Sequence, residues 1–147
     1  MGSLRDWEKS EIEFKDAISA FGKSAFLYRI TDTKEANRGR VGQKVVVKNT
    51  PSDFLLTYKG KMAYTEVKHC SNPTSFPFSG LTVGQKQAIL KQEKAGGRYI
   101  IFVYSAKHKT WYYITEELYL TYLEKGSKSI TWKDLYNFKW DKKCIPI

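Results

Sequence analysis

The sequence predicts an α/β domain in which helices flank both sides of a mixed central β-sheet. Apolar residues at helical spacing mark amphipathic segments, and runs rich in β-branched and aromatic residues mark strands. These segments follow one another in the order α-β-β-β-β-α-β-β-α. No internal repeat or low-complexity linker divides the 147 residues, so we expect one domain over residues 1–147, which is long enough to bury a core.

The N-terminal part is expected to contain one helix and two strands. The helix runs from Trp7 to Phe21 and is closed by Gly22. Its apolar face consists of Phe14, Ala17, Ile18 and Phe21. Strands are expected over residues 25–30 and 44–48, on either side of a polar and basic stretch.

A hairpin is expected in the middle of the chain. Residues 54–58 and 62–68 are rich in β-formers and are separated by Lys59, Gly60 and Lys61. Gly60 supplies the positive φ that a tight turn needs. The two strands are therefore predicted to run antiparallel.

The C-terminal half is expected to alternate between helices and strands. Thr82 is a candidate N-cap, and Gly96 follows the helix that it opens. The expected elements are a loop over 71–80, a helix over 83–94, a strand over 98–105 near the centre of the sheet, its hairpin partner over 110–114, a helix from 115 to about 124, and a tail of turns with a short helix over 132–138.

Two carboxylates and an amine converge at the end of the predicted hairpin. Asp53 immediately precedes the first strand, and the second strand brings Glu66 back to its level. Side chains alternate along a strand, so Glu66 and Lys68 share one face while Val67 points to the other. The plainer interpretation is a surface salt bridge between neighbouring positions of a strand.

Such a cluster has the ligand chemistry of a Mg²⁺ site. Mg²⁺ prefers oxygen ligands and keeps several waters, and Asp53, Glu66 and the backbone carbonyl of Val67 offer three oxygens. A metal held in this way activates water and neutralises charge on a phosphoryl oxygen. Lys68 is placed to orient the water or to stabilise the transition state.

A further carboxylate, Glu11, lies along the apolar face of the N-terminal helix. A carboxylate that points inward needs a cation or hydrogen bonds. The alternative is that Glu11 only flanks the face, and we expect Glu13 to be an ordinary solvated residue.

The motif order resembles a known family. The run from Asp53 through Glu66-Val67-Lys68 to Thr74-Ser75-Phe76-Pro77 and Gln85 resembles RecU-type and Hjc-type Holliday junction resolvases of the PD-(D/E)XK nuclease superfamily. The resemblance implies a restriction-endonuclease-like core. It also implies an Mg²⁺-dependent endodeoxyribonuclease, in which Mn²⁺ can substitute, acting on four-way junction DNA.

The resemblance also implies roles for single residues. Asp53, Glu66 and Gln85 match metal ligands, and Lys68 matches the transition-state lysine. Glu11 is similar to a glutamate of the first helix that assists metal or substrate binding, and Ser75 sits where a hydroxyl approaches the scissile phosphate. One departure is Pro51, where RecU proteins tend to carry a threonine, so the side chain at this position offers no hydroxyl ligand.

The charge balance points to a polyanionic partner. Lys and Arg total 25 against 15 Asp and Glu, which gives a net charge of +10. Nucleic acid is the first candidate partner and an anionic membrane the second. No apolar run has the length of a spanning helix, and no signal core opens the chain, so we expect no membrane insertion and a cytoplasmic location, in the host if a phage encodes the protein.

A basic arm at about residues 31–48 is the best candidate for DNA contact. It carries Lys34, Arg38, Arg40 and Lys44, which would contact phosphates without reading bases. In RecU proteins the matching region resembles a stalk that enters the junction, whereas the plainer interpretation is a mobile surface loop. Lys86 would extend the contact area.

A homodimer is expected from the mechanism, because a four-way junction needs two matching cuts. Its candidate contact residues are Phe76, Phe78, Trp111 and Tyr113. Two other functions stay open. The protein could be another PD-(D/E)XK repair or restriction-type endonuclease, or a non-catalytic DNA-binding module with a decayed site.

Overall fold

The computed structural model of the chain describes residues 3–30 and 50–147. Three α-helices lie in these parts: α1 (Asp6–Ser19), α3 (Val83–Ala95) and α4 (Glu116–Glu124). The strands are β1 (Ala25–Arg29), β2 (Phe54–Tyr58), β3 (Lys61–Cys70), β4 (Ser75–Pro77), β5 (Tyr99–Ser105), β6 (Thr110–Thr115) and β7 (Ser129–Thr131). Short 3-10 turns are η1 (Gly22–Ser24), η2 (Phe78–Gly80) and η3 (Tyr136–Phe138).

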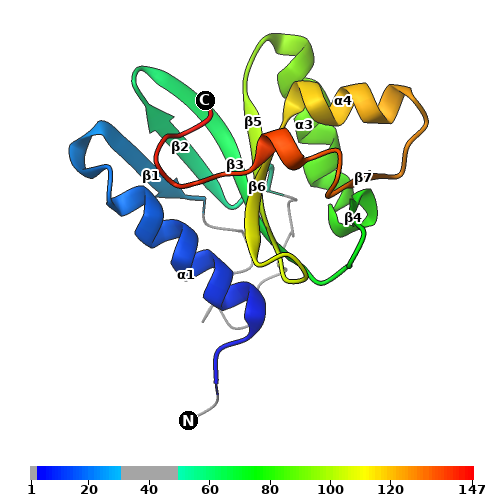
Figure 1. Cartoon of the computed structure of the whole chain (residues 1–147). Helices are drawn as coiled ribbons and strands as arrows, with labels where there is room; N and C mark the ends of the chain where they lie inside the picture. The colour runs from blue at the N-terminus through cyan, green and yellow to red at the C-terminus, as the bar shows by residue number, and fades with distance from the viewer. Residues whose placement is uncertain (1–2, 31–49) are drawn as a thin grey trace, which may run out of the picture.

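Five strands form the predicted mixed sheet, in the order β1-β2-β3-β5-β6 (Figure 1). The β3–β5 pair is parallel and the other three pairs are antiparallel. The chain crosses from β3 to β5 through α3, as a parallel connection requires. The fold class is therefore confirmed. β5 is an interior strand, while β3 occupies the central position of the five.

Helices cover the two faces of this sheet unevenly. On one face, Phe14 and Ile18 of α1 pack against Phe102 of β5. On the other face, Ile89 of α3 and Tyr119 of α4 pack with side chains of β5 and β6. Figure 1 shows α3 and α4 beside β5 and β6, at the opposite end of the sheet from β1 and β2.

The β2–β3 hairpin folds as its turn residues predict. Lys59 and Gly60 both have positive φ, 50° and 78°, which is the pattern of a type I′ turn. This turn fixes Tyr58 opposite Lys61 and, four pairs further along, Phe54 opposite Thr65. Asp53 and Glu66 therefore lie next to each other in the register.

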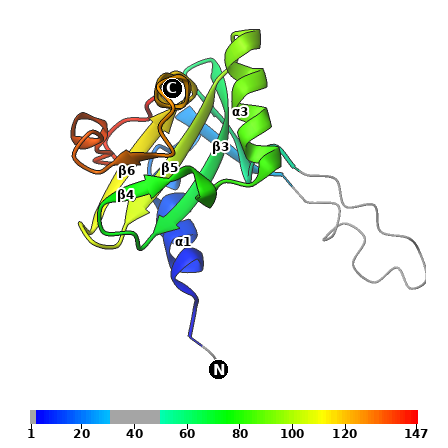
Figure 2. The same cartoon turned by 90° about the vertical axis from the view of Figure 1, so that its right-hand side faces the viewer.

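The predictions were wrong about two short segments. Ser75–Pro77 was expected within a loop and Ser129–Thr131 within a tail of turns, but they pair as a separate two-stranded antiparallel sheet, seen near α3 and β6 in Figure 2. Strands of three residues are too short to show a period of two, so the pattern gave no signal. The helix α1 ends at Ser19, earlier than expected, and Gly22 follows in the left-handed conformation with φ 60°.

Three of the four residues expected at a dimer contact are buried, so the expectation of exposed contacts was wrong for them. Phe76, Phe78 and Trp111 are 2 %, 5 % and 4 % exposed and belong to the core. Tyr113 is half-buried and packs edge-on against Phe138. Both faces of β6 are covered, so alternation along this strand does not produce an exposed row. The expected strand over 44–48 and the arm at about 31–48 lie outside the described residues.

Among residues 3–30 and 50–147, no helix has both the length and the apolar character needed to cross a bilayer.

Candidate active site

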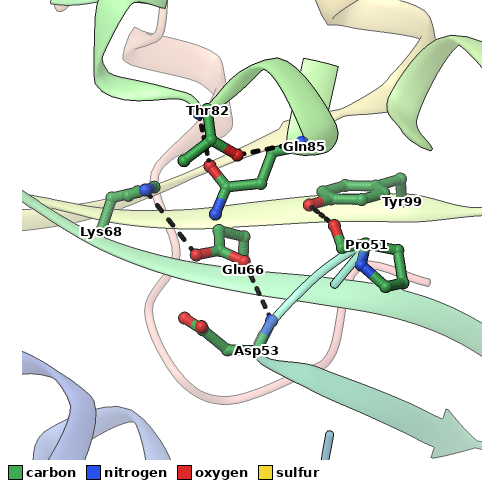
Figure 3. Close-up of polar contacts among 7 residues, drawn as sticks. All are labelled: Pro51, Asp53, Glu66, Lys68, Thr82, Gln85 and Tyr99. Atoms are coloured by element: carbon green, nitrogen blue, oxygen red, sulfur yellow. Dashed lines mark hydrogen bonds and ion pairs between the residues drawn. The ribbon is translucent and has the colours of Figure 1, made fainter. Parts of the chain in front are cut away.

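The end of the β2–β3 hairpin brings two carboxyl groups and an ammonium together (Figure 3). The backbone N–H of Asp53 donates a hydrogen bond of 2.9 Å to Oε2 of Glu66. The Nζ atom of Lys68 lies 3.7 Å from Oε1 of the same carboxylate. The two oxygens of Glu66 thus contact both neighbours, as the hairpin register requires.

The plainer interpretation of a surface salt bridge does not fit the burial of these groups. Glu66 is 2 % exposed, and the side chain of Lys68 is 22 % exposed. Val67 lies on the opposite face of β3, packed against the α1 side of the core. Alternation along the strand therefore places Glu66 and Lys68 together on the other face, as predicted, and the structure shows that this face also carries α3.

Burial dominates the electrostatics of the site. Desolvation raises the pKa of Glu66 to about 8, and the charge and side chain of Asp53 act in the same direction, while Lys68 acts against them. A buried acid beside a second carboxyl group is costly unless a cation balances it. One lysine ammonium at 3.7 Å leaves this cluster with an excess of negative charge.

The chemistry of the donor set fits a hard divalent cation. Among the described residues, no group of three or more His, Cys, Asp or Glu side chains gathers in one place. Two carboxylates are nevertheless a normal protein contribution for Mg²⁺, which keeps several waters. Burial first, and the neighbouring Asp53 second, raise the pKa of the Glu66 carboxyl, and a cation bound beside it would act in the opposite direction.

Gln85 is held at the start of α3 by a capping box. Its backbone N–H donates to Oγ1 of Thr82 at 3.1 Å, and its side-chain oxygen Oε1 accepts from the backbone N–H of Thr82 at 2.9 Å. Gln85 is 8 % exposed, and Figure 3 shows it on the same side of β3 as Glu66 and Lys68. The amide oxygen retains a second lone pair, so the cap leaves it able to accept one further bond.

The segment before Asp53 is fixed by residues that the sequence did not single out. The hydroxyl of Tyr99 donates a hydrogen bond of 2.6 Å to the backbone oxygen of Pro51. The hydroxyl of Ser52, which is 1 % exposed, donates to the backbone oxygen of Phe54 at 2.7 Å. Burial and the nearby carboxylates raise the pKa of Tyr99, so its hydroxyl stays a donor. The one sequence signal for Tyr99 was its place at the start of a strongly apolar strand.

The carboxylate of Glu11, which the sequence placed along the apolar face of α1, has a cationic partner. Its carboxylate forms an ion pair with Arg29 at the end of β1, and its side chain is 13 % exposed. The Arg29 guanidinium also lies 4.8 Å from the ring centre of Phe54, on the α1 side of the sheet. The expectation of an inward carboxylate with a cation is met, but its contact is to Arg29 and not to Asp53 or Glu66. Glu13 is exposed and pairs with Lys142.

Ser75 and Lys86 lie on the α3 side of the molecule. Together with parts of α4, β4 and β7, they line a cavity of about 520 Å³. Ser75 is 9 % exposed and Lys86 is half-buried. The other four expected DNA contacts, Lys34, Arg38, Arg40 and Lys44, lie outside the described residues.

Comparisons with known proteins agree with this architecture. The family model for RecU, recombination protein U, matches residues 11–144. The solved structure of Hjc from Archaeoglobus fulgidus, described as a Holliday junction resolvase from an archaeal hyperthermophile, superposes with a TM-score of 0.52 and 12 % identity. This match covers 87 % of the present chain and 92 % of the Hjc chain, and it establishes likeness of fold. The search of curated proteins gives no match.

Proposed function

The chain belongs to the family of recombination protein U, and we propose that it is a metal-dependent endonuclease that resolves four-way DNA junctions. The observation that carries this proposal is the buried contact of Asp53, Glu66 and Lys68. Two carboxyl groups and an amine of this kind are suited to hydrolysis of a phosphodiester. A Holliday junction is also the substrate named for the archaeal Hjc of the same fold.

The carboxylates of Asp53 and Glu66 would hold a Mg²⁺ ion, with Mn²⁺ as a substitute. The backbone carbonyl of Val67 is a further protein oxygen that we assign to it. Gln85 is assigned as a ligand through Oε1, which would have to turn toward the metal, because Figure 3 shows this oxygen facing Thr82 and the amide nitrogen facing Glu66. When bound, the metal activates a water and neutralises charge on the scissile phosphate. The raised pKa of Glu66 means that binding near neutral pH also displaces a proton from this carboxyl group.

Lys68 contributes a fixed positive charge beside the scissile phosphate. Its Nζ lies 3.7 Å from Glu66, and its partly exposed side chain leaves the ammonium accessible to substrate. A preorganised cation stabilises the charge that develops on the phosphoryl oxygens in the transition state. Tyr99 and the capped Gln85 act as positioning residues, because they fix the segment before Asp53 and the first turn of α3.

DNA would approach from the side that carries Lys68. Ser75 and Lys86 lie on the same side of the sheet, where Lys86 is suited to a phosphate contact. We assign Lys34, Arg38, Arg40 and Lys44 to further phosphate contacts on the basis of charge alone. Glu11 is assigned a supporting role through Arg29. The activity belongs in the cytoplasm, or in the host cytoplasm if a phage encodes the protein.

A homodimer is part of the proposal, because resolution of a junction needs two cuts at symmetry-related positions. A C2 dimer supplies two active sites in the required relation.

The experiment that tests this proposal uses a synthetic four-way junction with a different label on each strand, and a linear duplex of the same sequence. With Mg²⁺, we expect paired symmetric cuts in the junction and little cutting of the duplex at the same salt concentration. Equal cutting of both would favour another endonuclease of the superfamily. No metal-dependent cutting with either Mg²⁺ or Mn²⁺ would favour a DNA-binding module with a decayed site.

A further inference from the structure

A cavity of about 520 Å³ lies on the α3 side of the molecule. Residues of η2, α3, α4, β4 and β7 line it, and Figure 1 shows β4 and β7 next to the two helices. The apolar part of the lining consists of Pro77, Phe78, Tyr119 and Leu123. Sites that bind a small molecule have volumes of about 300–1,000 Å³, so this cavity has room for a ligand of that size.

The apolar part of the cavity is built on two aromatic rings. Phe78 and Tyr119 pack edge-on with their ring centres 4.8 Å apart, and both side chains are almost fully buried. Leu123 is 36 % exposed and therefore lies at the mouth of the cavity. The cavity thus offers a fixed apolar surface to a planar ring.

The polar groups of the cavity favour a negatively charged ligand. Lys86 and Lys128 belong to the lining together with four serines, whereas no aspartate or glutamate of the described residues does. Lysines in a concave and partly apolar site attract an anion strongly, because low-dielectric walls focus the electric field. Serine hydroxyls both donate and accept hydrogen bonds, so they can contact the polar edge of a ring. A ligand that combines phosphate with a polar planar ring fits all of these features.

Two connections place the cavity beside the proposed metal site. Lys86 directly follows Gln85, so both side chains leave the first turn of α3, about 100° apart around the helix. The thiol of Cys70, two residues beyond Lys68 on β3, donates to the backbone oxygen of Ser75 at 3.6 Å. A DNA strand with its scissile phosphate at Lys68 therefore runs close to the cavity.

We propose that this cavity, which we call the nucleotide cavity, receives one unpaired nucleotide of the DNA junction. The inference rests on the proposed function and names the part of the substrate that the protein reads. Enzymes that take a base out of the stack hold it between aromatic and apolar side chains and contact its polar edge. In the nucleotide cavity the base lies against Phe78 and Tyr119, with serine hydroxyls at its edge, and the two lysines hold the flanking phosphates.

An intact duplex or a protein partner fits the nucleotide cavity less well. The bases of a duplex are enclosed by their stack, so a double helix brings only phosphates to Lys86 and leaves the apolar part empty. Stacking is interrupted where four arms meet, so a nucleotide at the branch point costs less to extrude than one within an arm. An acidic peptide would match the lysines, but a position beside the DNA path favours the substrate itself. The cavity thereby favours a branched substrate over a linear one.

The first test locates the base by photo-crosslinking. Four-way junctions carry 5-iododeoxyuridine at one position at a time, and they are bound to Asp53→Asn with a chelator so that no cleavage occurs. We expect a position at or next to the branch point to crosslink to the peptide that contains Phe78 or to the one that contains Tyr119. No crosslink to either peptide from any position, or an equal yield from a linear duplex of the same sequence, would overturn the proposal.

The second test closes the cavity. Leu123→Trp places a large ring at the mouth, and Thr121→Trp is the matched control, because Thr121 is exposed on the same helix and lies outside the lining. Extrusion of a base leaves its partner unpaired, so a thymine at the partner position should react with permanganate when the wild type or Thr121→Trp is bound. Circular dichroism melting checks that both variants fold.

Leu123→Trp should keep this thymine protected, because the base can no longer leave the stack. The junction Kd of Leu123→Trp should rise about tenfold relative to Thr121→Trp at the same salt concentration, which is the size of the contribution that one stacked base makes. Equal thymine reactivity or equal junction affinity of the two variants would overturn the proposal. That result is also the one expected if the cavity bound an acidic peptide instead.

Neither test needs cleavage, so the failure of this inference differs from the failure of the proposed function. Metal-dependent paired cuts by the wild type, combined with an empty nucleotide cavity, would refute the inference alone. A base that crosslinks in the cavity of a protein that never cuts DNA would refute the proposed nuclease activity alone.

Discussion

Replacement of Glu66 by Gln should change how the stability of the metal-free protein depends on pH. Gln has nearly the same shape as Glu, and its amide oxygen can still accept the 2.9 Å hydrogen bond from the Asp53 N–H. The substitution therefore removes a buried charge and leaves the packing in place. We expect Glu66→Gln to be more stable than the wild type at alkaline pH and equally stable in acid.

The magnitude follows from the pKa of Glu66, which is raised from 4.5 in the unfolded chain to about 8 in the folded protein. Below pH 4.5 this carboxyl group is protonated in both states, so it causes no loss of stability. Between the two pKa values the unfolded state releases the proton first, and wild-type stability falls by at most about 1.4 kcal/mol per pH unit. Above about pH 8 the loss is complete, and after relaxation of the site we expect it to be on the order of 3 kcal/mol.

The assay is chemical denaturation with a chelator, at intervals from pH 5 to pH 9. The difference in unfolding free energy between Glu66→Gln and wild type should grow through this range and then level off. Glu13→Gln is the control, since Glu13 is exposed, pairs with Lys142 and has a lowered pKa. Glu13→Gln should lower the unfolding free energy, and this destabilisation should begin at lower pH than the effect of Glu66→Gln. A carboxyl group whose pKa is lowered in the folded protein stabilises the fold at pH values above its pKa in the unfolded chain.

Parallel stability curves for wild type and Glu66→Gln across this pH range would refute the reasoning. They would show that the folded protein does not hold the proton on this carboxyl group, so that no deficit of positive charge exists at the site. A destabilised Glu66→Gln at pH 9 would refute it more strongly.

Three further predictions concern the site. The affinity for Mg²⁺ or Mn²⁺, measured by calorimetric titration, should weaken by up to about tenfold for each pH unit below pH 8. The reason is that metal binding displaces the proton of Glu66, and a Kd that does not change with pH would contradict this. Thr82→Ala and Thr115→Ala each remove a helix N-cap, and each should lower the free energy of unfolding by about 1 kcal/mol. Only Thr82→Ala also releases the Gln85 side chain, so only this variant should slow junction cleavage. Equal cleavage rates for the two variants would contradict the role of the capping box. Tyr99→Phe should lower the cleavage rate and weaken metal affinity without loss of DNA binding, since it frees the segment before Asp53, and unchanged values of both would contradict a positioning role.

The contacts among Asp53, Glu66 and Lys68 could be predicted because they depend on local structure. The turn at Lys59 and Gly60 sets the hairpin register, and that register decides that Asp53 meets Glu66. Alternation along β3 then decides that Lys68 shares the face of Glu66. A constellation built from neighbouring strands of one hairpin is readable from spacing alone.

Contacts between distant segments could not be predicted in this way. The bond from Tyr99 to Pro51 joins residues 48 positions apart, and the β4–β7 pair joins Ser75 to Thr131. For Glu11 the sequence indicated the need for a cation but did not identify Arg29, because that choice depends on how α1 crosses the sheet.

Burial was the other limit of the sequence patterns. Aromatic residues at alternating positions, such as Trp111, gave no sign of whether their face would be covered by other elements. The same limit applied to Phe26 and Tyr28, which are strongly exposed although their strand has the sequence pattern of a half-buried strand. Which face of a sheet lacks a helix is a property of the tertiary fold.

The most direct test of the central claim compares junction cleavage and junction binding by the wild type and by Asp53→Asn, over a titration of Mg²⁺ and then Mn²⁺. We predict metal-dependent paired cuts by the wild type, loss of cleavage by Asp53→Asn in both metals, and junction affinity within a fewfold of the wild type at the same salt. Undiminished cleavage by Asp53→Asn would contradict the assignment of Asp53, Glu66 and Lys68 as the catalytic centre.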